Sequence, residues 1–401
     1  MELTTQIETL VSGALLEEVT EIRRHLHRYP ELSFQEKETS AYIRKLLDSW
    51  GIPFQFPLVE TGLLARIKGE KGGRVIALRT DMDALPLNEE TGLPYRSVRP
   101  GVMHACGHDV HMASMLGAIR VLDQLRDRIE GEILFIFQPG EEKVPGGARL
   151  MLEEGIFKET KPDLIIAQHV MPDMEAGHVG FKPGMYMASS DEIYLTVRGK
   201  GGHGALPQNI ADPVLMASHI MISLQQEIHR KAPSDTPTVL SFGKVVADGA
   251  VNVIPDQVVL EGTFRTMNET WRKEAHELIA RIASGIAASL GGACEIEIRH
   301  GYPMLRNHEG ITTEAARLAS RLLGQERVEE MGIRMTAEDF AWFTQSVPGM
   351  LYRLGVRQPG SDQVFQLHTS GFRVDESALQ TGISMLSYLS IELLKITTFR
   401  K

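Results

Sequence analysis

Cysteine is scarce in this sequence. The 401 residues contain only two cysteines, Cys106 and Cys294, and these lie far apart along the chain. Two such residues make a poor disulfide framework, which excludes a small secreted scaffold held together by disulfides. Cys106 lies inside a histidine cluster, where a reduced thiolate would have a use. Together with the lack of a secretory signal and of a membrane-spanning run, this leads us to expect a cytoplasmic protein.

Positive charges are fewer than negative ones, and no apolar segment is long. Asp and Glu outnumber Lys and Arg by 52 to 42, which gives a formal net charge of −10, and the two signs are mixed along the chain. No basic stripe is available to neutralise a phosphate backbone, so nucleic acid is not an expected partner. The first residues are polar and acidic, and no apolar run approaches membrane-spanning length, so we expect neither a secretory signal nor a membrane partner.

The sequence does contain the material for a large hydrophobic core. Hydrophobic residues make up 43% of the chain and charged residues 23%, as in an ordinary globular protein. A chain of this length exceeds the size at which one core usually keeps growing. We therefore expect two domains, or one domain with a large insertion.

The first half of the chain alternates helical and strand-like patterns. Apolar residues at helical spacing predict helices over 15–26, 42–50 and 110–125. Continuous apolar runs at 75–78, 133–137 and 164–167 are typical of strands buried on both faces of a parallel sheet. Their alternation predicts an α/β layer architecture.

The pattern changes near Gly184. From there the chain reads strand 192–197, helix 212–230, strands 239–246 and 258–266, helix 270–290 and strand 294–299. This order predicts a ferredoxin-like α+β unit. We expect it to span 185–299 as an insertion into a mostly parallel-sheet catalytic domain formed by 1–184 and 300–401.

Polar residues follow three of the predicted strands. Asp81 and Asp83 come after the first, Glu141 and Glu142 after the second, and His169 after the third. The carboxyl ends of parallel strands meet at one edge of a sheet, where ligands bind in such folds. The folded chain should therefore bring these residues together.

The segment 104–111, HACGHDVH, adds nitrogen and sulfur donors just before a helix. Gly107 permits a tight turn that lets Cys106 and His108 converge. This donor set suits zinc, cobalt, nickel or manganese better than magnesium or calcium. His104 and His111 are weaker candidates, and at least one of them should support a ligand or lie on the surface.

Each of these groups has a structural alternative. His169 alone could be a hydrogen-bonded structural histidine. The pair Glu141 and Glu142 could be a solvated acidic pair that opens the next helix, and Asp81 and Asp83 could be turn or capping residues.

Five motifs, in chain order, resemble the aminoacylase/carboxypeptidase family of dinuclear metallopeptidases. The resemblance is to its amidohydrolase branch, which includes hippurate hydrolases, N-acyl-amino-acid amidohydrolases and auxin-conjugate hydrolases. The motifs are 27–33 (HRYPELS), 81–86 (DMDALP), 104–111 (HACGHDVH), 137–142 (FQPGEE) and 199–204 (GKGGHG).

The resemblance implies two divalent metal ions, which could be zinc, manganese, cobalt or nickel. It implies one set of metal ligands, namely Cys106, His108, Glu142, His169 and His368. It also implies that Glu141 is the general base and that Asp83 is a supporting carboxylate. Asp81 stands where the wider family carries a histidine ligand, so the roles of Asp81, His104 and His111 stay open.

The resemblance also implies roles for the inserted domain. This domain would mediate dimerisation, and His203 would reach a neighbouring active site to polarise the scissile carbonyl. Asn252 and Arg265 resemble positions that contact substrate. Without the resemblance, His203 would be interpreted as a loop residue and Arg265 as a surface charge.

The predicted function is hydrolysis of the amide bond of N-acyl amino acids by a homodimer or higher homo-oligomer. A metal-dependent dipeptidase or carboxypeptidase of the same family is the first alternative. A cysteine hydrolase that uses Cys106 as its nucleophile is a second, but it leaves Glu141, Glu142 and the distant histidines without a use. A non-catalytic metal-binding protein would have no need of Glu141.

Overall fold

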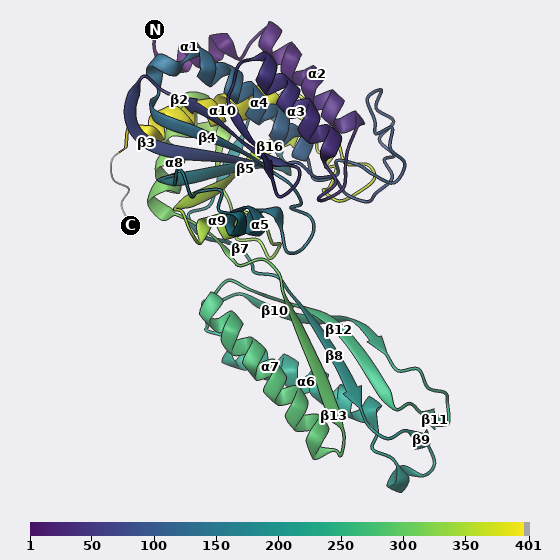
Figure 1. The fold of residues 1–401 in the computed structure, drawn as a ribbon. Coiled ribbons are helices and arrows are strands. Elements are labelled where there is room, and N and C mark those ends of the chain that lie inside the picture. Colours follow the sequence, from purple (N-terminus) through teal and green to yellow (C-terminus); the bar gives the residue numbers. More distant parts are fainter. Residues whose placement is uncertain (397–401) are drawn as a thin grey trace. The chain divides into compact units, whose positions relative to one another are not determined.

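The structure is a computed structural model that describes residues 1–396. The chain divides into two compact units (Figure 1). The first unit is formed by Met1–Gly184, Arg306–Gly332 and residues 339–396, and the second by Met185–Leu305 and Ile333–Glu338. The second unit thus interrupts the first in sequence. The sequence-based prediction placed the end of this insertion at residue 299.

The first unit is built on an eight-stranded sheet with the order β1-β2-β4-β3-β5-β16-β6-β15. The central strands β4, β3, β5 and β16 are parallel to one another. The strands are Phe54–Leu58 (β1), Gly62–Lys68 (β2), Lys71–Asp81 (β3), Glu130–Gln138 (β4), Leu164–Glu175 (β5), Val179–Phe181 (β6), Val328–Glu330 (β15) and Gly349–Arg357 (β16). The predicted mixed α/β class with a mostly parallel sheet is confirmed.

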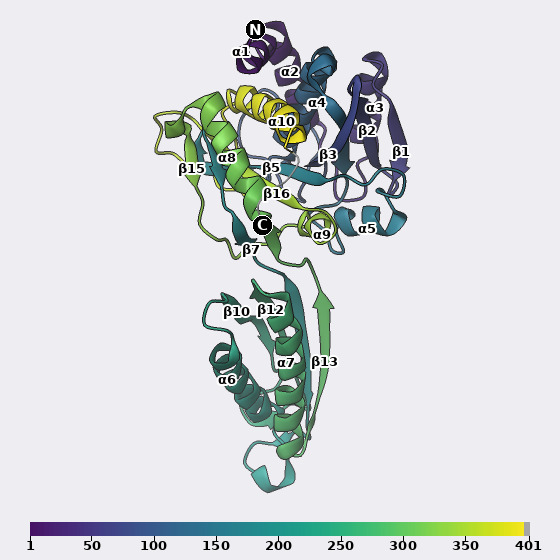
Figure 2. The ribbon, with the colours of Figure 1, turned by 90° about the vertical axis from the view of Figure 1, so that its left-hand side faces the viewer.

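Helices cover both faces of this sheet. Helices α2, α4 and α10 lie over one face, and α5 and α9 lie on the other side (Figure 2). The helices of this unit are Leu3–Leu10 (α1), Ala14–Arg28 (α2), Lys37–Ser49 (α3), His108–Gln124 (α4), Gly147–Glu154 (α5), Glu309–Leu323 (α8), Ala341–Thr344 (α9) and Ala378–Leu394 (α10), with short 3-10 turns at Arg126–Arg128 and Gln325–Arg327.

Helix α4 is buried around nearly its whole circumference. It packs against α2 on one side and α10 on another. A Cβ atom at Gly117 would lie 2.7 Å from the side chain of Ile383, so glycine allows α4 and α10 to approach closely. The apolar residues of α4 therefore form a central part of the core.

The second unit is a four-stranded antiparallel sheet with the order β10-β12-β8-β13. One face is apolar: Ile193, Leu195 and Val197 alternate along β8 and are fully buried. The elements are Asp191–Arg198 (β8), Pro213–Lys231 (α6), Thr238–Val246 (β10), Gln257–Thr266 (β12), Glu269–Ser289 (α7) and Ala293–His300 (β13). This βαββαβ order is the one that the sequence predicts.

Short elements complete the chain. Strands Gly202–His203 (β9) and Val253–Ile254 (β11) pair in the second unit, which also has a 3-10 turn at Pro207–Asn209. Strands Gly184–Met187 (β7) and Leu305–Asn307 (β14) lie where the chain passes from one unit to the other. Across residues 1–396, no helix combines the length and apolar character needed to span a bilayer.

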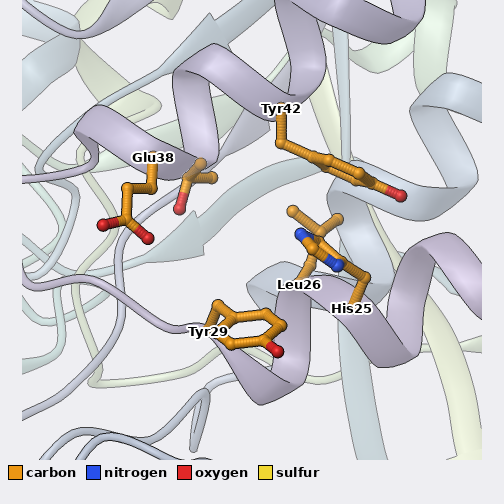
Figure 3. Close-up of a pocket in the computed structure, with 6 residues that line it drawn as sticks. His25, Leu26, Tyr29, Glu38 and Tyr42 are labelled. Atoms are coloured by element: carbon orange, nitrogen blue, oxygen red, sulfur yellow. The ribbon is translucent and has the colours of Figure 1, made fainter.

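A small pocket lies between α2 and α3 in the first unit (Figure 3). Its volume is about 180 Å³, and it is lined by His25, Leu26, Tyr29, Glu38, Thr39 and Tyr42. The His25 ring stacks on Tyr42 with 3.9 Å between centroids. None of the residues predicted to act in catalysis lines this pocket.

Asp191 is a buried charge that ties β8 to α7. Its two carboxylate oxygens accept hydrogen bonds from Arg272 at 2.6 and 2.8 Å, and one of them also contacts Nε2 of His276 at 2.8 Å. Burial alone would raise the pKa of Asp191, but the Arg272 and His276 side chains lower it to about 2. Because the folded pKa lies below the unfolded value, this group stabilises the fold above about pH 4 and loses that effect as the pH falls towards 2.

We expect Asp191→Asn to lower the free energy of unfolding at pH 7. The ionised carboxylate accounts for about 2 kcal/mol by linkage, and the loss should be larger because Arg272 is left without its buried partner. The difference from wild type should shrink between pH 4 and 2. Urea unfolding followed by Trp271 fluorescence, with Trp50 and Trp342 replaced by Phe, measures this. Glu192→Gln, at an exposed position on the same strand, is the control, and a difference independent of pH would contradict the assignment.

Candidate metal centre

The carboxyl ends of the parallel strands gather most of the predicted site residues. Asp81 is the last residue of β3, Glu141 and Glu142 follow β4, and His169 lies in β5. The start of α4 brings His108 to the same edge. These residues are distant in sequence, and sheet topology makes them neighbours.

Ligand-type atoms converge there in overlapping groups. Within each group the donor atoms all lie within 4.8 Å of one another. The groups include Cys106, His108 and His169; Cys106, Glu142 and His368; His108, Glu141 and Glu142; and Asp81, His108 and His111. All five residues predicted as metal ligands therefore lie at one place, together with the predicted base.

A glycine turn brings Cys106 and His108 together. Gly107 has φ of +82°, and a Cβ atom there would lie 2.5 Å from the Val170 side chain, so any larger residue would both strain the backbone and clash. The turn places the Cys106 sulfur 3.6 Å from Nε2 of His169. This geometry agrees with the turn predicted from the sequence.

His368 comes from a C-terminal loop that is tied to the same segment. Its backbone N–H donates to the carbonyl of Ala105 at 2.9 Å. Its φ of +60° is strained for a residue with a side chain. The ring reaches Glu142 at 3.2 Å. The loop thus holds a strained histidine against the other donors.

Backbone carbonyls fix the orientation of two histidine rings. Nδ1 of His108 lies 2.8 Å from the carbonyl oxygen of Asp83, and Nδ1 of His169 lies 2.8 Å from that of Val170. A carbonyl can only accept, so each Nδ1 carries the proton and donates it. Each Nε2 therefore faces the cluster. Nε2 of His108 is buried and has no hydrogen-bond partner among residues 1–396.

Asp83 braces the segment that carries the acidic pair. One carboxylate oxygen accepts from the hydroxyl of Ser33 at 2.6 Å and from the backbone N–H of Glu142 at 2.9 Å. Together with its carbonyl bond to His108, Asp83 contacts both a candidate ligand and the backbone of another. These contacts give the residue a supporting position.

The negative charges around Cys106 favour the binding of a cation. Cys106 is 6% exposed. Burial raises its pKa well above the usual range, and the negative charges of Glu142, Glu141 and Asp81 raise it further. The same charges oppose formation of a free thiolate, whereas a catalytic cysteine needs a lowered pKa. A divalent cation would reverse this balance, so the residues present fit a metal site.

A proton on His108 partly compensates for this negative charge. Burial alone would lower the pKa of His108, but Asp81 and Asp83 raise it to about 10. His169 differs, because burial and the charge of Arg353 hold its pKa well below the usual range. A cation beside His108 would take the place of that proton.

Two further polar residues of the 104–111 segment, His104 and Asp109, are buried. His104 is buried, and burial lowers its pKa to about 4. Asp109 lies 2.8 Å from Nε of Arg23 and 2.8 Å from Nδ1 of His27. These contacts anchor the first turn of α4 to α2.

The three predicted substrate residues belong to the second unit. His203 is exposed in β9, and its Nδ1 accepts from the backbone N–H of Ala205 at 3.1 Å. Asn252 is exposed beside β11. Arg265 is half-buried in β12, and within residues 1–396 it contacts the carbonyl of Met335 at 3.2 Å and forms no ion pair. Burial lowers the pKa of Arg265.

Some buried polar residues at this edge escaped the sequence analysis. Arg79 lies in the apolar run of β3 yet binds Asp81 and Asp339 at 2.7 Å each. Glu36 accepts from the backbone N–H of Gly140 at 2.8 Å, next to Glu141. The available signal was a charge inside an otherwise apolar strand, which requires a buried partner.

Comparison with known proteins finds a family model and relatives that cover most of the chain. A model of "Peptidase family M20/M25/M40" matches residues 77–392. An N-acetylcysteine deacetylase of Bacillus subtilis (strain 168) is 39% identical over 375 residues, which cover 93% of this chain and 96% of that protein. An N-acyl-L-amino acid amidohydrolase of Geobacillus stearothermophilus is 41% identical over 289 residues, covering 72% of this chain and 78% of that protein.

A solved structure from Bacillus subtilis has the same fold. It is described as a dinuclear metal binding peptidase from the M20 family. It is 35% identical, its TM-score is 0.82, and the match covers 96% of this chain and 99% of that one. With the donor clusters at the sheet edge, this similarity supports two divalent ions in the present protein.

We expect the metal-free protein to bind two equivalents of zinc. His169 and His368 belong to different donor groups, so His169→Ala and His368→Ala should each lose one equivalent. Cys106→Ala should weaken the binding of both ions, because Cys106 belongs to the donor groups of both His169 and His368. Elemental analysis after dialysis, together with calorimetric titration, measures this, and His178→Ala in the same unit is the control. Two tightly held equivalents in Cys106→Ala would contradict the expected sharing.

Proposed function

We propose that this chain, which belongs to peptidase family M20/M25/M40 and is a metal-dependent hydrolase of amide bonds, acts on N-acyl amino acids. The names of its relatives support this choice, since they include deacetylases of N-acetylcysteine and N-acetyldiaminopimelate and an N-acyl-L-amino acid amidohydrolase. The single observation that carries the proposal is the convergence of five ligand-type side chains beside one further carboxylate, Glu141.

The proposed metal ligands follow from the donor groups. One ion would contact His169 and the other His368, and Cys106, His108 and Glu142 would complete the two sets. A thiolate makes the site softer than one made of oxygen alone. Zinc, manganese, cobalt and nickel suit it better than magnesium or calcium.

The proposed chemistry is hydrolysis with Glu141 as general base. The bound ions supply Lewis acidity, which makes a water molecule more acidic and offsets negative charge on a carbonyl oxygen. Glu141 accepts a proton from that water and delivers it to the departing amide nitrogen. Its neighbour Glu142 shares a donor group with Cys106 and His368 and lies 3.2 Å from the His368 ring, so we assign the two adjacent carboxylates different roles. Asp83 acts by keeping Glu142 and His108 in place.

The proposed substrate contacts lie in the second unit. Arg265 would bind the carboxylate of the amino acid, because its half-buried guanidinium has no ion-pair partner among residues 1–396. Nδ1 of His203 accepts a hydrogen bond, which leaves its Nε2 free to donate to the substrate carbonyl. Asn252 would contact the substrate from the adjacent β11.

We further propose that the second unit mediates a homodimer in which His203 serves the neighbouring subunit. Large apolar side chains are exposed on this unit, including Ile222 at 59%, Val245 at 51% and Leu215 at 50%. Exposed apolar groups of this kind favour association. The cytoplasmic location expected from the sequence stays a prediction.

Two alternatives differ in chemistry or in substrate. A dipeptidase or carboxypeptidase would use the same metal site and differ only in the group that it accepts. A cysteine hydrolase would need a reactive thiolate, and the buried, acidic surroundings of Cys106 oppose one. Turnover of a panel of N-acyl amino acids and dipeptides by metal-loaded protein distinguishes among them.

We expect Glu141→Gln to keep its metal and lose its turnover. The glutamine retains the size of the side chain but cannot accept the proton, so kcat should fall by about 10² to 10⁴. Glu142→Gln is the matched variant, and it should lose metal as well as activity. Turnover of N-acetyl amino acids and metal content are measured on the same samples.

Two other results for Glu141→Gln would contradict the proposed role of Glu141. Near-normal turnover in this variant would remove Glu141 as the base. Loss of metal in this variant would instead make Glu141 a ligand, and its separation in role from Glu142 would be wrong.

We expect Arg265→Gln to raise KM for N-acetyl amino acids by about 10- to 100-fold, the effect of losing a hydrogen bond between charged groups. The effect should vanish for the same substrates with the carboxylate replaced by a carboxamide. Arg299→Gln, at an exposed position in the same unit, is the control. An equal rise in KM for both substrate types would contradict a carboxylate contact.

A further inference from the structure

His111 lies in the first turn of α4, between two of the proposed metal ligands. It is 1% exposed. Its ring centroid is 4.8 Å from that of His169 and 5.5 Å from that of His108. Its place in the histidine-rich segment suggests a ligand, but its hydrogen bonds indicate something else.

Both ring nitrogens of His111 are already used. Nε2 accepts a hydrogen bond from the backbone N–H of Val170 at 2.9 Å, and Nδ1 contacts a carboxylate oxygen of Asp81 at 2.7 Å. A backbone N–H can only donate, so Nε2 must use its lone pair there and the proton must lie on Nδ1. His111 in this arrangement is neutral and has no lone pair left for a metal.

The backbone of Val170 connects His111 to His169. The ladder between β3 and β5 ends at the pair Arg79 and Ala167, so the N–H of Val170 lies beyond the last β3 partner. His111 supplies the missing acceptor at this buried position. The carbonyl of the same residue accepts from Nδ1 of His169 at 2.8 Å, which turns Nε2 of His169 towards Cys106.

A buried chain of contacts holds His111 in turn. The second carboxylate oxygen of Asp81 accepts from Arg79 at 2.7 Å. Arg79 also donates to Asp339 at 2.7 Å and to Gln138 at 2.8 Å. Arg79, Asp81, Gln138 and Asp339 are each at most 1% exposed. These contacts therefore run from the core of the sheet to Val170 in the middle of β5 through residues that are shielded from water.

We propose that His111 is a positioning residue: held by Asp81, it fixes the Val170 backbone and thereby the direction in which His169 presents Nε2 to a metal. This rests on the proposed role of His169 as a ligand. It gives Asp81, which stands where the wider family has a histidine ligand, a part in the site through His111. Partners of this kind contribute about 10- to 100-fold to metal affinity.

A pair of substitutions separates the two hydrogen bonds of His111. The amide of Asn reaches the position of Nδ1, and that of Gln reaches the position of Nε2. His111→Gln can still accept from Val170, whereas His111→Asn can contact only Asp81. His229→Asn, at an exposed position, is the control.

The readout is metal affinity of the full-length protein, measured by stepwise calorimetric titration of metal-free samples with cobalt(II) and by the visible spectrum of the bound cobalt. We expect His111→Asn and His111→Ala to lower the affinity for one of the two ions by about 10- to 100-fold and to change the visible spectrum of the cobalt bound there. We expect His111→Gln to stay within about threefold of wild type. Circular dichroism of the metal-free variants checks that each is folded.

Several outcomes overturn the inference. Equal losses in the Gln and Asn variants would give His111 a structural role only, and no loss in either would leave it without a role. The proposed ligand set is tested separately by His169→Ala. If that variant keeps both ions, the ligand assignment fails; if it loses one ion while His111→Asn loses none, the positioning role alone fails.

Discussion

Buried negative charge at the carboxyl edge of the parallel sheet is the constraint on which the rest of this site depends. The carboxylates Glu141, Glu142, Asp81 and Asp83 all lie there beside the Cys106 thiol, and each is nearly or fully buried. Charges of one sign cannot be gathered away from water without compensation. Arg79 and a proton on His108 supply part of it. Two divalent ions complete the balance, which is why the site is suited to polarising an amide.

The surrounding residues differ in which proposed ligand they contact. Asp83 contacts Glu142 and His108, His111 contacts the Val170 backbone beside His169, and Ala105 holds the loop of His368. These contacts come from several elements of the first unit, so the packing of that unit positions the proposed ligands.

Much of this could be predicted from the sequence. The buried parallel strands, the ferredoxin-like order of the second unit and the resemblance to the aminoacylase/carboxypeptidase family are confirmed. The sheet edge brings together Glu142 and His169, as strand order predicts, and the turn at Gly107 adds Cys106 and His108. His368 came only from the resemblance, because a loop histidine without a strand before it has no periodic signal.

Other features could not be predicted, for physical reasons. The role of His111 depends on where the β3–β5 ladder ends, and strand ends cannot be read accurately from apolar patterning. Arg79 and Glu36 are charges whose partners lie far away in the chain, so only the folded topology identifies them.

If this edge of the sheet holds two ions through a shared cysteine, anomalous diffraction from zinc-loaded crystals should show it. We expect two zinc peaks, one against Nε2 of His169 and one against Nε2 of His368, with the Cys106 sulfur at about 2.3 Å from at least one of them. A single peak, or two peaks away from these side chains, would contradict it.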